Sequence, residues 1–203
     1  MENTQKKHSV KDFLKRKDIE ISARRYGIDA LGAMAQGLFA SLLIGTIIST
    51  LGEQFGLGIL IEIGKYAKEA TGAAMAVAIG YALKCPPLVL FSLIAVGGAS
   101  NALGGAGGPL AVLVVAIIAS EFGKAVSKET KLDIIVTPSV TIIIGVLLSM
   151  WWAPAIGTAA NAVGSAIMWA TELQPFFMGV IVSVLVGVAL TLPISSAAIC
   201  AAF

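Results

Sequence analysis

Three polar residues recur along an apolar stretch near the end of the chain. Asn161, Ser165 and Glu172 are separated by four and seven residues, so on a helix they fall within roughly 40° of one another. Gly157 lies on the same side, one turn earlier. Sugar hydroxyls both donate and accept hydrogen bonds, so amide and carboxylate groups suit them. The stripe predicts a binding wall for a polar solute, with helix–helix packing through small residues as the alternative.

A short internal similarity adds a candidate in another part of the chain. Residues 97–105 read GGASNALGG and residues 157–165 read GTAANAVGS, which aligns Asn101 with Asn161. Many transporters are built from internal repeats and bind their solute where the repeats meet. The similarity predicts Asn101 as a second polar contributor. The alternative is a chance match in a chain rich in glycine and alanine.

A third candidate is a lysine inside an apolar segment. Lys84 precedes Cys85, Pro86 and Pro87, and an ammonium group in lipid is costly unless it has a partner. One interpretation is that Lys84 pairs with a phosphate, an anionic solute or a carboxylate such as Glu172. The other is that Lys84 lies at the end of a helix and has no binding role. In the second case its ammonium group reaches the membrane interface along an apolar stem.

The sequence lacks the patterns of several other chemistries. It contains no GxxxxGK(S/T) phosphate-binding loop. Its one histidine, His8, lies in a basic segment, and its two cysteines, Cys85 and Cys200, lie in apolar runs without a CxxC spacing. Structural zinc sites and disulfide scaffolds are therefore not predicted. We expect no catalytic residue, no metal and no cofactor in this chain, so a phosphoryl group would have to be carried by a partner.

The composition indicates what kind of element holds these residues. Of the 203 residues, 57% are hydrophobic and only 13% are charged, whereas soluble chains carry about 25% charged residues. The mean hydropathy is +0.91. So much apolar surface has to face lipid. The sequence predicts an all-α fold, a polytopic transmembrane helical bundle with broken or re-entrant helices.

Positive charge is concentrated at the N-terminus. Eight of the 14 Lys and Arg residues lie in the first 25 positions. Beside an apolar segment, such a cluster marks the cytoplasmic side of a membrane more often than a nucleic-acid site. We expect residues 1–25 to be a cytoplasmic basic segment, with an amphipathic helix over 9–25 capped by Ser9 and Asp12, or else a solvated tail. Residues 26–203 are expected to form the transmembrane domain.

The apolar runs predict how the first half of the chain meets the membrane. Residues 26–51 are long enough for a span. Residues 52–71 carry charged and apolar residues on opposite sides, which is typical of a helix on the membrane surface. Residues 72–98 are predicted to cross as one segment broken by prolines. Residues 109–122 are too short to cross and are predicted to form a re-entrant arm or half-helix.

The second half is predicted to contain two further spans. They are residues 134–152, which end in a tryptophan pair typical of an interface, and residues 175–192. Residues 155–173 are expected to form a separate helix rich in small residues. Residues 194–203 begin another apolar segment that stops without a polar cap, so the chain is expected to be incomplete at its C-terminal end.

A charged loop separates the two halves. Residues 121–133 include Glu121 and Lys124, which are expected to form an i,i+3 ion pair near a membrane boundary. The loop is rich in lysine, so it is expected to be cytoplasmic, like the N-terminus. An even number of crossings must then separate the two. Two crossings, with the third segment re-entrant, satisfy this rule.

Several longer stretches resemble a known membrane family. They are ALKCPPLVLFS (82–92), SNALGGAGGPLA (100–111), SEFGKAVSKETKLDIIVTPSVTI (120–142), WATELQPFFMG (169–179) and VALTLPISSAAI (188–199). In this order they resemble the enzyme IIC-like family of the bacterial phosphotransferase system, in the branch that includes the perfringolysin O regulatory protein. The resemblance covers nearly the whole chain from about residue 25.

The resemblance implies a permease component of the bacterial inner membrane, with a cytoplasmic N-terminus. It would move a sugar or polyol while a separate cytoplasmic IIB protein, supplied from phosphoenolpyruvate through phosphocarrier proteins, phosphorylates it. Related IIC proteins bind sugar through a glutamate and polar residues near broken helices, which implies substrate contacts at Glu172 and Gln174. The ATELQP stretch is only loosely similar to their Glu-Pro motif. Related permeases commonly form homodimers, and no nucleic-acid partner is implied.

Two other functions are compatible with the same fold. A membrane-bound regulator or sensor could keep a IIC-like fold and change its output, as the toxin-regulator branch suggests. An ion-coupled carrier could move the solute without phosphorylating it. Altered transcription with normal uptake would identify the regulator, and uptake in vesicles lacking phosphoenolpyruvate would identify the carrier.

Overall fold

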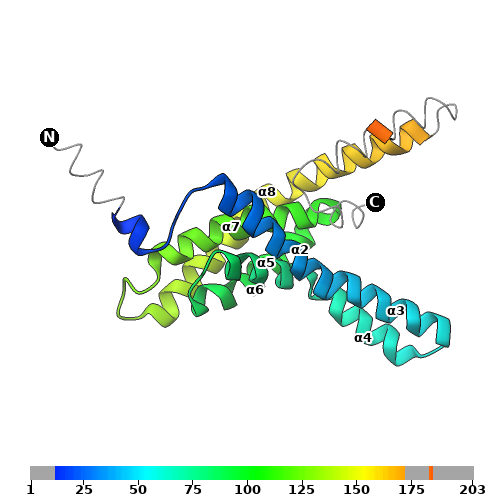
Figure 1. The fold of residues 1–203 in the computed structure, drawn as a ribbon, viewed down its shortest axis with the longest axis horizontal. Helices are drawn as coiled ribbons and strands as arrows, with labels where there is room; N and C mark the ends of the chain where they lie inside the picture. Colours follow the sequence, from blue (N-terminus) through cyan, green and yellow to red (C-terminus); the bar gives the residue numbers. More distant parts are fainter. Residues whose placement is uncertain (1–11, 172–182, 185–203) are drawn as a thin grey trace.

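The computed structural model describes residues 12–171 and 183–184, and its regular elements are all helical in this part of the chain (Figure 1). The predicted all-α fold is confirmed. The elements, in chain order, are η1 (Arg25–Ala30), α2 (Leu31–Leu38), η2 (Phe39–Leu43), α3 (Ile44–Phe55), α4 (Gly58–Glu69), α5 (Thr71–Ala82), α6 (Pro87–Gly104), η3 (Gly105–Gly107), α7 (Gly108–Val126) and α8 (Asp133–Thr171).

The N-terminal segment does not form the single helix expected over residues 9–25. Residues 12–16 are helical, a turn follows at 17–18, and residues 19–22 have no regular structure. Asp18 has a φ of 52°, a left-handed conformation that a continuing α-helix excludes. The predicted cap at Ser9 lies outside the described residues.

The first predicted span is one long helix. Two π-helical turns, η1 and η2, are continuous with α2 and α3, so helical structure runs over 31 residues, Arg25–Phe55. At 1.5 Å per residue it is about 46 Å long, which exceeds the hydrocarbon core of a bilayer, about 30 Å. Gly56, at a φ of 68°, ends it.

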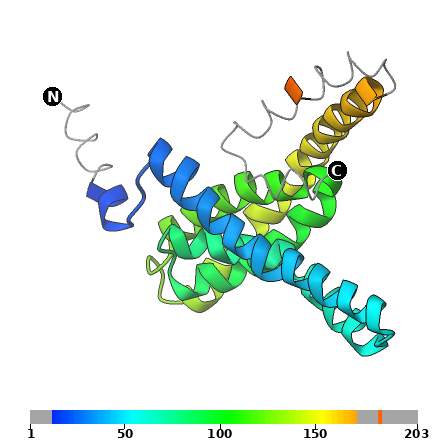
Figure 2. The ribbon, with the colours of Figure 1, turned by 45° about the vertical axis from the view of Figure 1, so that its right-hand side comes forward.

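Helix α4 returns along α3 and forms a hairpin that projects beyond the other helices (Figure 2). The two backbones touch, because a Cβ at Gly45 would lie 2.8 Å from the carbonyl oxygen of Gly64. The apolar residues Ile59, Ile63 and Tyr66 of α4 are exposed. The predicted helix within 52–71 is confirmed, and its placement on the membrane surface stays a prediction.

Residues 72–98 do not cross as one broken segment, so that prediction was wrong. The chain reverses between α5 and α6, and the two helices pack antiparallel. Gly72 and Gly97 face each other so closely that a Cβ on either would collide with the carbonyl group of the other. Pro86 and Pro87 start a new helix here rather than kink an old one, since proline suits the first helical position.

The glycine-rich stretch makes a second reversal. Gly105, at a φ of 51°, opens the short helix η3, and α7 then runs back along α6. Helix α7 has 19 residues, about 28 Å. The segment predicted over 109–122 was therefore too short, because the helix continues to Val126 through residues assigned to a loop, and its re-entrant placement in the membrane stays a prediction.

Helix α8 unites two segments that were predicted to be separate. It runs through Pro154 for 39 residues, about 58 Å. It lies parallel to α6, and the hydroxyl oxygens of Ser100 and Ser149 are 2.7 Å apart in the buried contact between them. Gly157 of α8 packs against the carbonyl oxygen of Gly104.

The helical passes bring the N-terminal segment and the lysine-rich loop to one end of the molecule. The chain runs away along η1–α3, returns along α4 and α5, leaves along α6 and returns along α7. Four helical passes separate the two basic regions and bring them to the same end of the molecule, and the number of membrane crossings between them stays a prediction. We call this end, residues 12–25, 83–86 and 124–132, the basic end.

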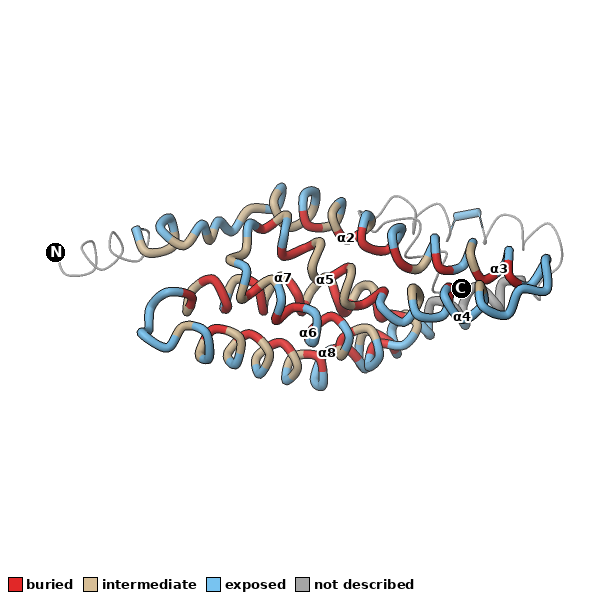
Figure 3. Tube along the Cα trace, turned by 90° about the horizontal axis from the view of Figure 1, so that it is seen from below, coloured by how far each residue is buried: buried red, intermediate tan, exposed pale blue. Residues whose placement is uncertain are grey.

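The bundle is apolar on its outside as well as in its core. Buried residues line the facing sides of α5–α8, and α3 and α4 are largely exposed (Figure 3). Phe91, Ile143, Leu147 and Trp151 are each more than half exposed. Three helical stretches are long and apolar enough to span a membrane: Arg25–Phe55, Pro87–Val126, which contains the reversal, and Asp133–Ala162. This surface suits lipid.

Candidate functional site

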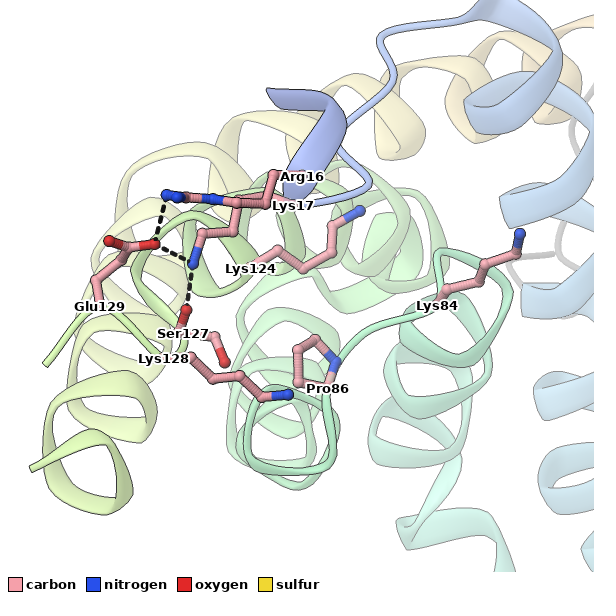
Figure 4. A pocket seen from close by; sticks show the side chains of 8 residues that line it. All are labelled: Arg16, Lys17, Lys84, Pro86, Lys124, Ser127, Lys128 and Glu129. Atoms are coloured by element: carbon pink, nitrogen blue, oxygen red, sulfur yellow. Dashed lines mark hydrogen bonds and ion pairs between the residues drawn. The ribbon is translucent and has the colours of Figure 1, made fainter. Parts of the chain in front are cut away.

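A pocket of about 400 Å³ lies at the basic end, between the N-terminal segment, the α5–α6 turn and the C-terminal end of α7 (Figure 4). Five of its eight lining residues are cationic and one is anionic. We call this set the basic pocket. It consists of Arg16, Lys17, Lys84, Pro86, Lys124, Ser127, Lys128 and Glu129.

Lys124 connects the three segments that meet here. Its side chain is only 1% exposed. Its Nζ donates to the carbonyl oxygens of Asp18 at 2.9 Å and Leu83 at 3.2 Å. Nζ also lies 2.8 Å from Oε2 of Glu121, at ion-pair distance but without the alignment of a hydrogen bond. A buried ammonium group needs such partners, and the predicted pair of Glu121 and Lys124 is confirmed.

Arg25 makes a second connection between the same segments. Its Nη2 donates to Oδ2 of Asp18 at 2.7 Å and to the carbonyl oxygen of Leu83 at 2.9 Å. The hydrogen bond and charge of Arg25 lower the pKa of the Asp18 carboxyl group. Next to it, the hydroxyl of Tyr26 donates to Oε1 of Glu121 at 3.1 Å. The start of the first long helix is thereby fixed to α7.

Glu129 holds the N-terminal helical turn against the loop after α7. Its Oε1 lies 3.1 Å from Nη2 of Arg16 and 2.5 Å from Nζ of Lys17. Lys17 also donates to the carbonyl oxygen of Ser127. The hydrogen bond from Lys17, with the charges of Lys17 and Arg16, lowers the pKa of Glu129. The carboxylate is 41% exposed, so these pairs are individually weak.

The two remaining lysines of the pocket form no direct ion pair in the described part of the chain, although the charge of Lys84 acts on Asp18 and that of Lys128 on Asp133. Neither Lys84 nor Lys128 forms an ion pair or a side-chain hydrogen bond there. The ammonium group of Lys128 points toward Pro86, whereas that of Lys84 points away from Glu129 (Figure 4). Lys84 is exposed at the end of α5, and its predicted partner Glu172 lies outside the described residues.

Asn101 lies far from the basic pocket, near the opposite end of α6. It is half-buried between α5 and α7. A Cβ at Gly72 would come within 2.6 Å of its Cβ, and a Cβ at Gly108 within 2.6 Å of its Oδ1. Asn101 therefore fills the space between two glycines. This close contact is a packing role, and a solute contact at Asn101 stays a prediction.

The first two residues of the predicted polar stripe, Asn161 and Ser165, lie on the C-terminal part of α8, which extends past the bundle (Figures 1 and 2). Asn161 and Ser165 are both exposed, and the structure brings neither of them together with Asn101 or Lys84. Glu172 and Gln174 lie outside the described residues. The stripe as a solute-binding wall stays a prediction.

The match with known proteins covers most of the chain. Residues 28–203 match the family described as phosphotransferase system, EIIC. The chain belongs to this family. Comparisons with curated proteins and with solved structures return no match. As a member, this EIIC chain is a membrane component of sugar transport, and the family implies a cytoplasmic IIB partner.

The EIIC match begins after the N-terminal basic segment. Arg16 and Lys17, which line the basic pocket, precede residue 28 and so lie outside the matched region. The pocket thus combines cations of the matched region with cations that come before it.

Sequence reasoning missed most of the partners at the basic end of this EIIC chain. Asp18, Arg25 and Tyr26 were not candidates, and Lys124 was assigned to a charged loop. The one available signal was the density of lysine in two regions expected on the same side. Across residues 12–171 and 183–184, no group of three His, Cys, Asp or Glu residues could hold a metal ion.

Proposed function

We propose that this EIIC chain is the permease component of a phosphoenolpyruvate-dependent sugar phosphotransferase system in a bacterial cell membrane. It moves a sugar or a polyol across the bilayer for phosphorylation by a separate IIB protein, which receives its phosphoryl group through a phosphocarrier chain. The observation that carries this proposal is the family match over residues 28–203, which includes α2 to α8. The apolar outer surface of the same helices supports a membrane location.

The N-terminus is proposed to be cytoplasmic. The N-terminal segment and the lysine-rich loop contact each other at the basic end through Arg16, Lys17 and Glu129. Basic residues next to spans favour the cytoplasmic side of the membrane. Because the N-terminal segment and the lysine-rich loop are in contact, both can lie on that side. A cytoplasmic IIB protein would work on this side of the membrane.

The solute contacts are proposed to be Asn161, Ser165, Glu172 and Gln174, with Asn101 as a further candidate. Asn161 and Ser165 are exposed on an otherwise apolar helix, where a polar side chain in lipid is costly without a partner. A solute path, or a second copy of the chain in a homodimer, would supply such partners.

Uptake by cells that carry variants in place of the native chain tests this proposal. A deletion strain should lose the uptake and phosphorylation of at least one labelled sugar or polyol. Asn161→Ala should lower the rate about tenfold, since an unmatched solute hydroxyl costs about 1–3 kcal/mol. Thr158→Ala is a matched control on the same helix, because its hydroxyl already donates to the carbonyl oxygen of Ala155 at 2.8 Å.

Two results would contradict the permease function. One is a deletion strain in which every phosphotransferase-dependent uptake is intact. The other is changed transcription in that strain with normal uptake, which would identify a membrane-bound regulator. An equal loss of uptake in Asn161→Ala and Thr158→Ala would contradict the assignment of the solute wall but not the permease function.

A further inference from the structure

We propose that the basic pocket binds a phosphate group, carried either by a small free anion or by the headgroup of an anionic lipid. This site is distinct from the proposed solute wall, because none of its lining residues belongs to that wall. It is also partly outside the EIIC match, which begins after Arg16 and Lys17.

The charges in the pocket do not balance. Lys124 is offset by Glu121, and Arg16 and Lys17 share the single carboxylate of Glu129. Lys84 and Lys128 form no direct ion pair among the residues that the structure describes, and the carboxylates that their charges reach, Asp18 and Asp133, do not line the pocket. A concave site lined by charges of one sign concentrates counter-ions of the other sign.

The helix that starts at the pocket adds to this positive potential. Pro86 lines the pocket and immediately precedes Pro87, the first residue of the 18-residue helix α6. No side chain caps this helix end. The positive end of the helix dipole and the uncapped N–H groups of the first turn favour an anion here.

The backbone around the pocket is held in an unfavourable conformation. Asp18, Lys84 and Lys128 have φ values of 52°, 56° and 62°, and they are the described part's only non-glycine residues with positive φ. Such conformations are costly and gather at functional sites. Lys124 fixes two of these turns through the carbonyl oxygens of Asp18 and Leu83, so the pocket is preformed rather than collapsed.

The position of the pocket suits a phosphate at a membrane boundary. The apolar stretches that could span a bilayer begin at Arg25, Pro87 and Asp133, and one ends at Val126. The residues that line the pocket come from the segments next to these four ends. Lipid phosphates lie at this depth, where each nearby lysine or arginine attracts them. The volume of about 400 Å³ falls within the range of small-ligand pockets, about 300–1,000 Å³.

Binding by the purified full-length chain in detergent tests the site with two probes. The first is phosphatidylglycerol, counted by native mass spectrometry against phosphatidylcholine. The second is inorganic phosphate, followed by calorimetry at low salt. The variants are Lys84→Gln, Lys128→Gln and their combination. Lys131→Gln is the matched control, because Lys131 is exposed in the same loop and does not line the pocket.

Each lysine should contribute about fivefold to the affinity for phosphatidylglycerol or phosphate. The double variant should therefore bind roughly 30-fold more weakly than the native chain. Lys131→Gln should bind as tightly as the native chain. Phosphatidylglycerol binding that phosphate does not displace supports a lipid headgroup, and phosphate binding without lipid selectivity supports a free anion. The proposal is overturned if the native chain binds neither probe, or if Lys131→Gln weakens binding as much as the double variant. Lys128→Arg, which keeps the charge, should retain binding, and equal loss in Lys128→Arg and Lys128→Gln also overturns it.

Discussion

Lys124 shows how a single charged side chain can organise one end of a membrane bundle. Its ammonium group is almost fully buried, yet it has three oxygen partners from Asp18, Leu83 and Glu121. Two of these partners are the backbone carbonyl oxygens of Asp18 and Leu83, which accept no hydrogen bond from the N–H groups of a helix. A buried charge is costly on its own and stabilising only when such partners are in place.

Lys124→Met should therefore destabilise the protein strongly. It leaves the carboxylate of Glu121 without its cation and the carbonyl oxygen of Asp18 without this donor, whereas the carbonyl oxygen of Leu83 keeps its hydrogen bond from Arg25. Breaking a buried pair costs about 3–5 kcal/mol. Thermal unfolding in detergent, followed by fluorescence, measures the effect. Lys65→Met is the control, since Lys65 pairs with Glu69 on the exposed surface of α4 and should cost about 0.5 kcal/mol or less. Equal melting temperatures for the two variants would contradict this assignment.

The contact of the N-terminal turn with the loop should weaken in acid. The pKa of Glu129 is lowered in the folded state by Lys17 and Arg16. Its contribution is thus fully present above the unfolded pKa, about 4.3, and is lost as the pH falls through the lower folded value. Energy transfer between labels on cysteines at Lys15 and Lys131, both exposed, should fall as the pH drops below this unfolded value.

Glu129→Gln provides the control for this pH dependence. The neutral amide should loosen the contact already at pH 7 and leave a smaller change in acid. Other carboxyl groups at the basic end contribute to that change, among them Asp18, whose pKa Arg25 lowers, and Asp133, which accepts a hydrogen bond from the backbone N–H of Lys128. An unchanged acid response in Glu129→Gln would show that Glu129 is not the group that titrates.

Sequence periodicity located part of the candidate chemistry at the residue scale. It identified the Glu121–Lys124 pair because both partners lie on one helix turn. It did not reveal that Lys124 is buried, because the carbonyl oxygen of Asp18 lies 106 positions away in the chain. The basic pocket was missed for the same reason, since its members come from segments that only the fold brings together.

The helices of this bundle approach one another through glycine. Gly37 lies against α5, Gly72 against Gly97 and Gly123 against the side chain of Thr141, and an added Cβ at each position would collide with its neighbour. In lipid, apolar side chains gain little by meeting each other, so close backbone approach and dispersion contacts supply more of the association.

Gly97→Ala should disrupt the contact between α5 and α6. The new methyl group would meet the carbonyl oxygen of Gly72 and the Cβ of Ala76, and such overpacking costs about 1–3 kcal/mol. Gly98→Ala is the matched control in the next position, where an added Cβ meets nothing within 4 Å. It should be neutral or stabilising by up to about 1 kcal/mol. The melting temperatures of the two variants measure the difference, and equal values would contradict the packing shown here.

The elements were predicted more accurately than their connections. Hydropathy placed helices in residues 26–51 and 134–152, because spans need long apolar runs. It missed the reversal at residues 83–86, because a proline pair fits both a kink and the start of a helix. It also divided α8 at Pro154, where the helix in fact continues. The missed reversal and the divided helix have the same cause. Packing against segments distant in the sequence decides both, and local sequence patterns carry no information about that packing.

At the scale of the whole molecule, two short reversals turn apolar runs into a bundle with one charged end. Both reversals occur within about 25 residues, at 83–86 and at 105–107. The helices that these reversals join, α5 with α6 and α6 with α7, are therefore antiparallel neighbours, and each loop at the basic end contains lysine. The hairpin of α3 and α4 extends in the other direction (Figure 2), so the two ends of the molecule differ in both shape and charge.

This arrangement makes a topology prediction that single cysteines can test. In a variant with Cys85 and Cys200 replaced by serine, a cysteine at Gln54 should react with a membrane-impermeant maleimide in intact cells, because the α3–α4 hairpin points away from the basic end. Cysteines at Lys15 and Lys131 should react only after permeabilisation, since four helical passes place both regions on one side and basic residues favour the cytoplasm. Opposite labelling of Lys15 and Lys131 would require an odd number of crossings. That result is incompatible with the ion pairs of Arg16 and Lys17 to Glu129, so the labelling pattern tests the fold and the basic end together.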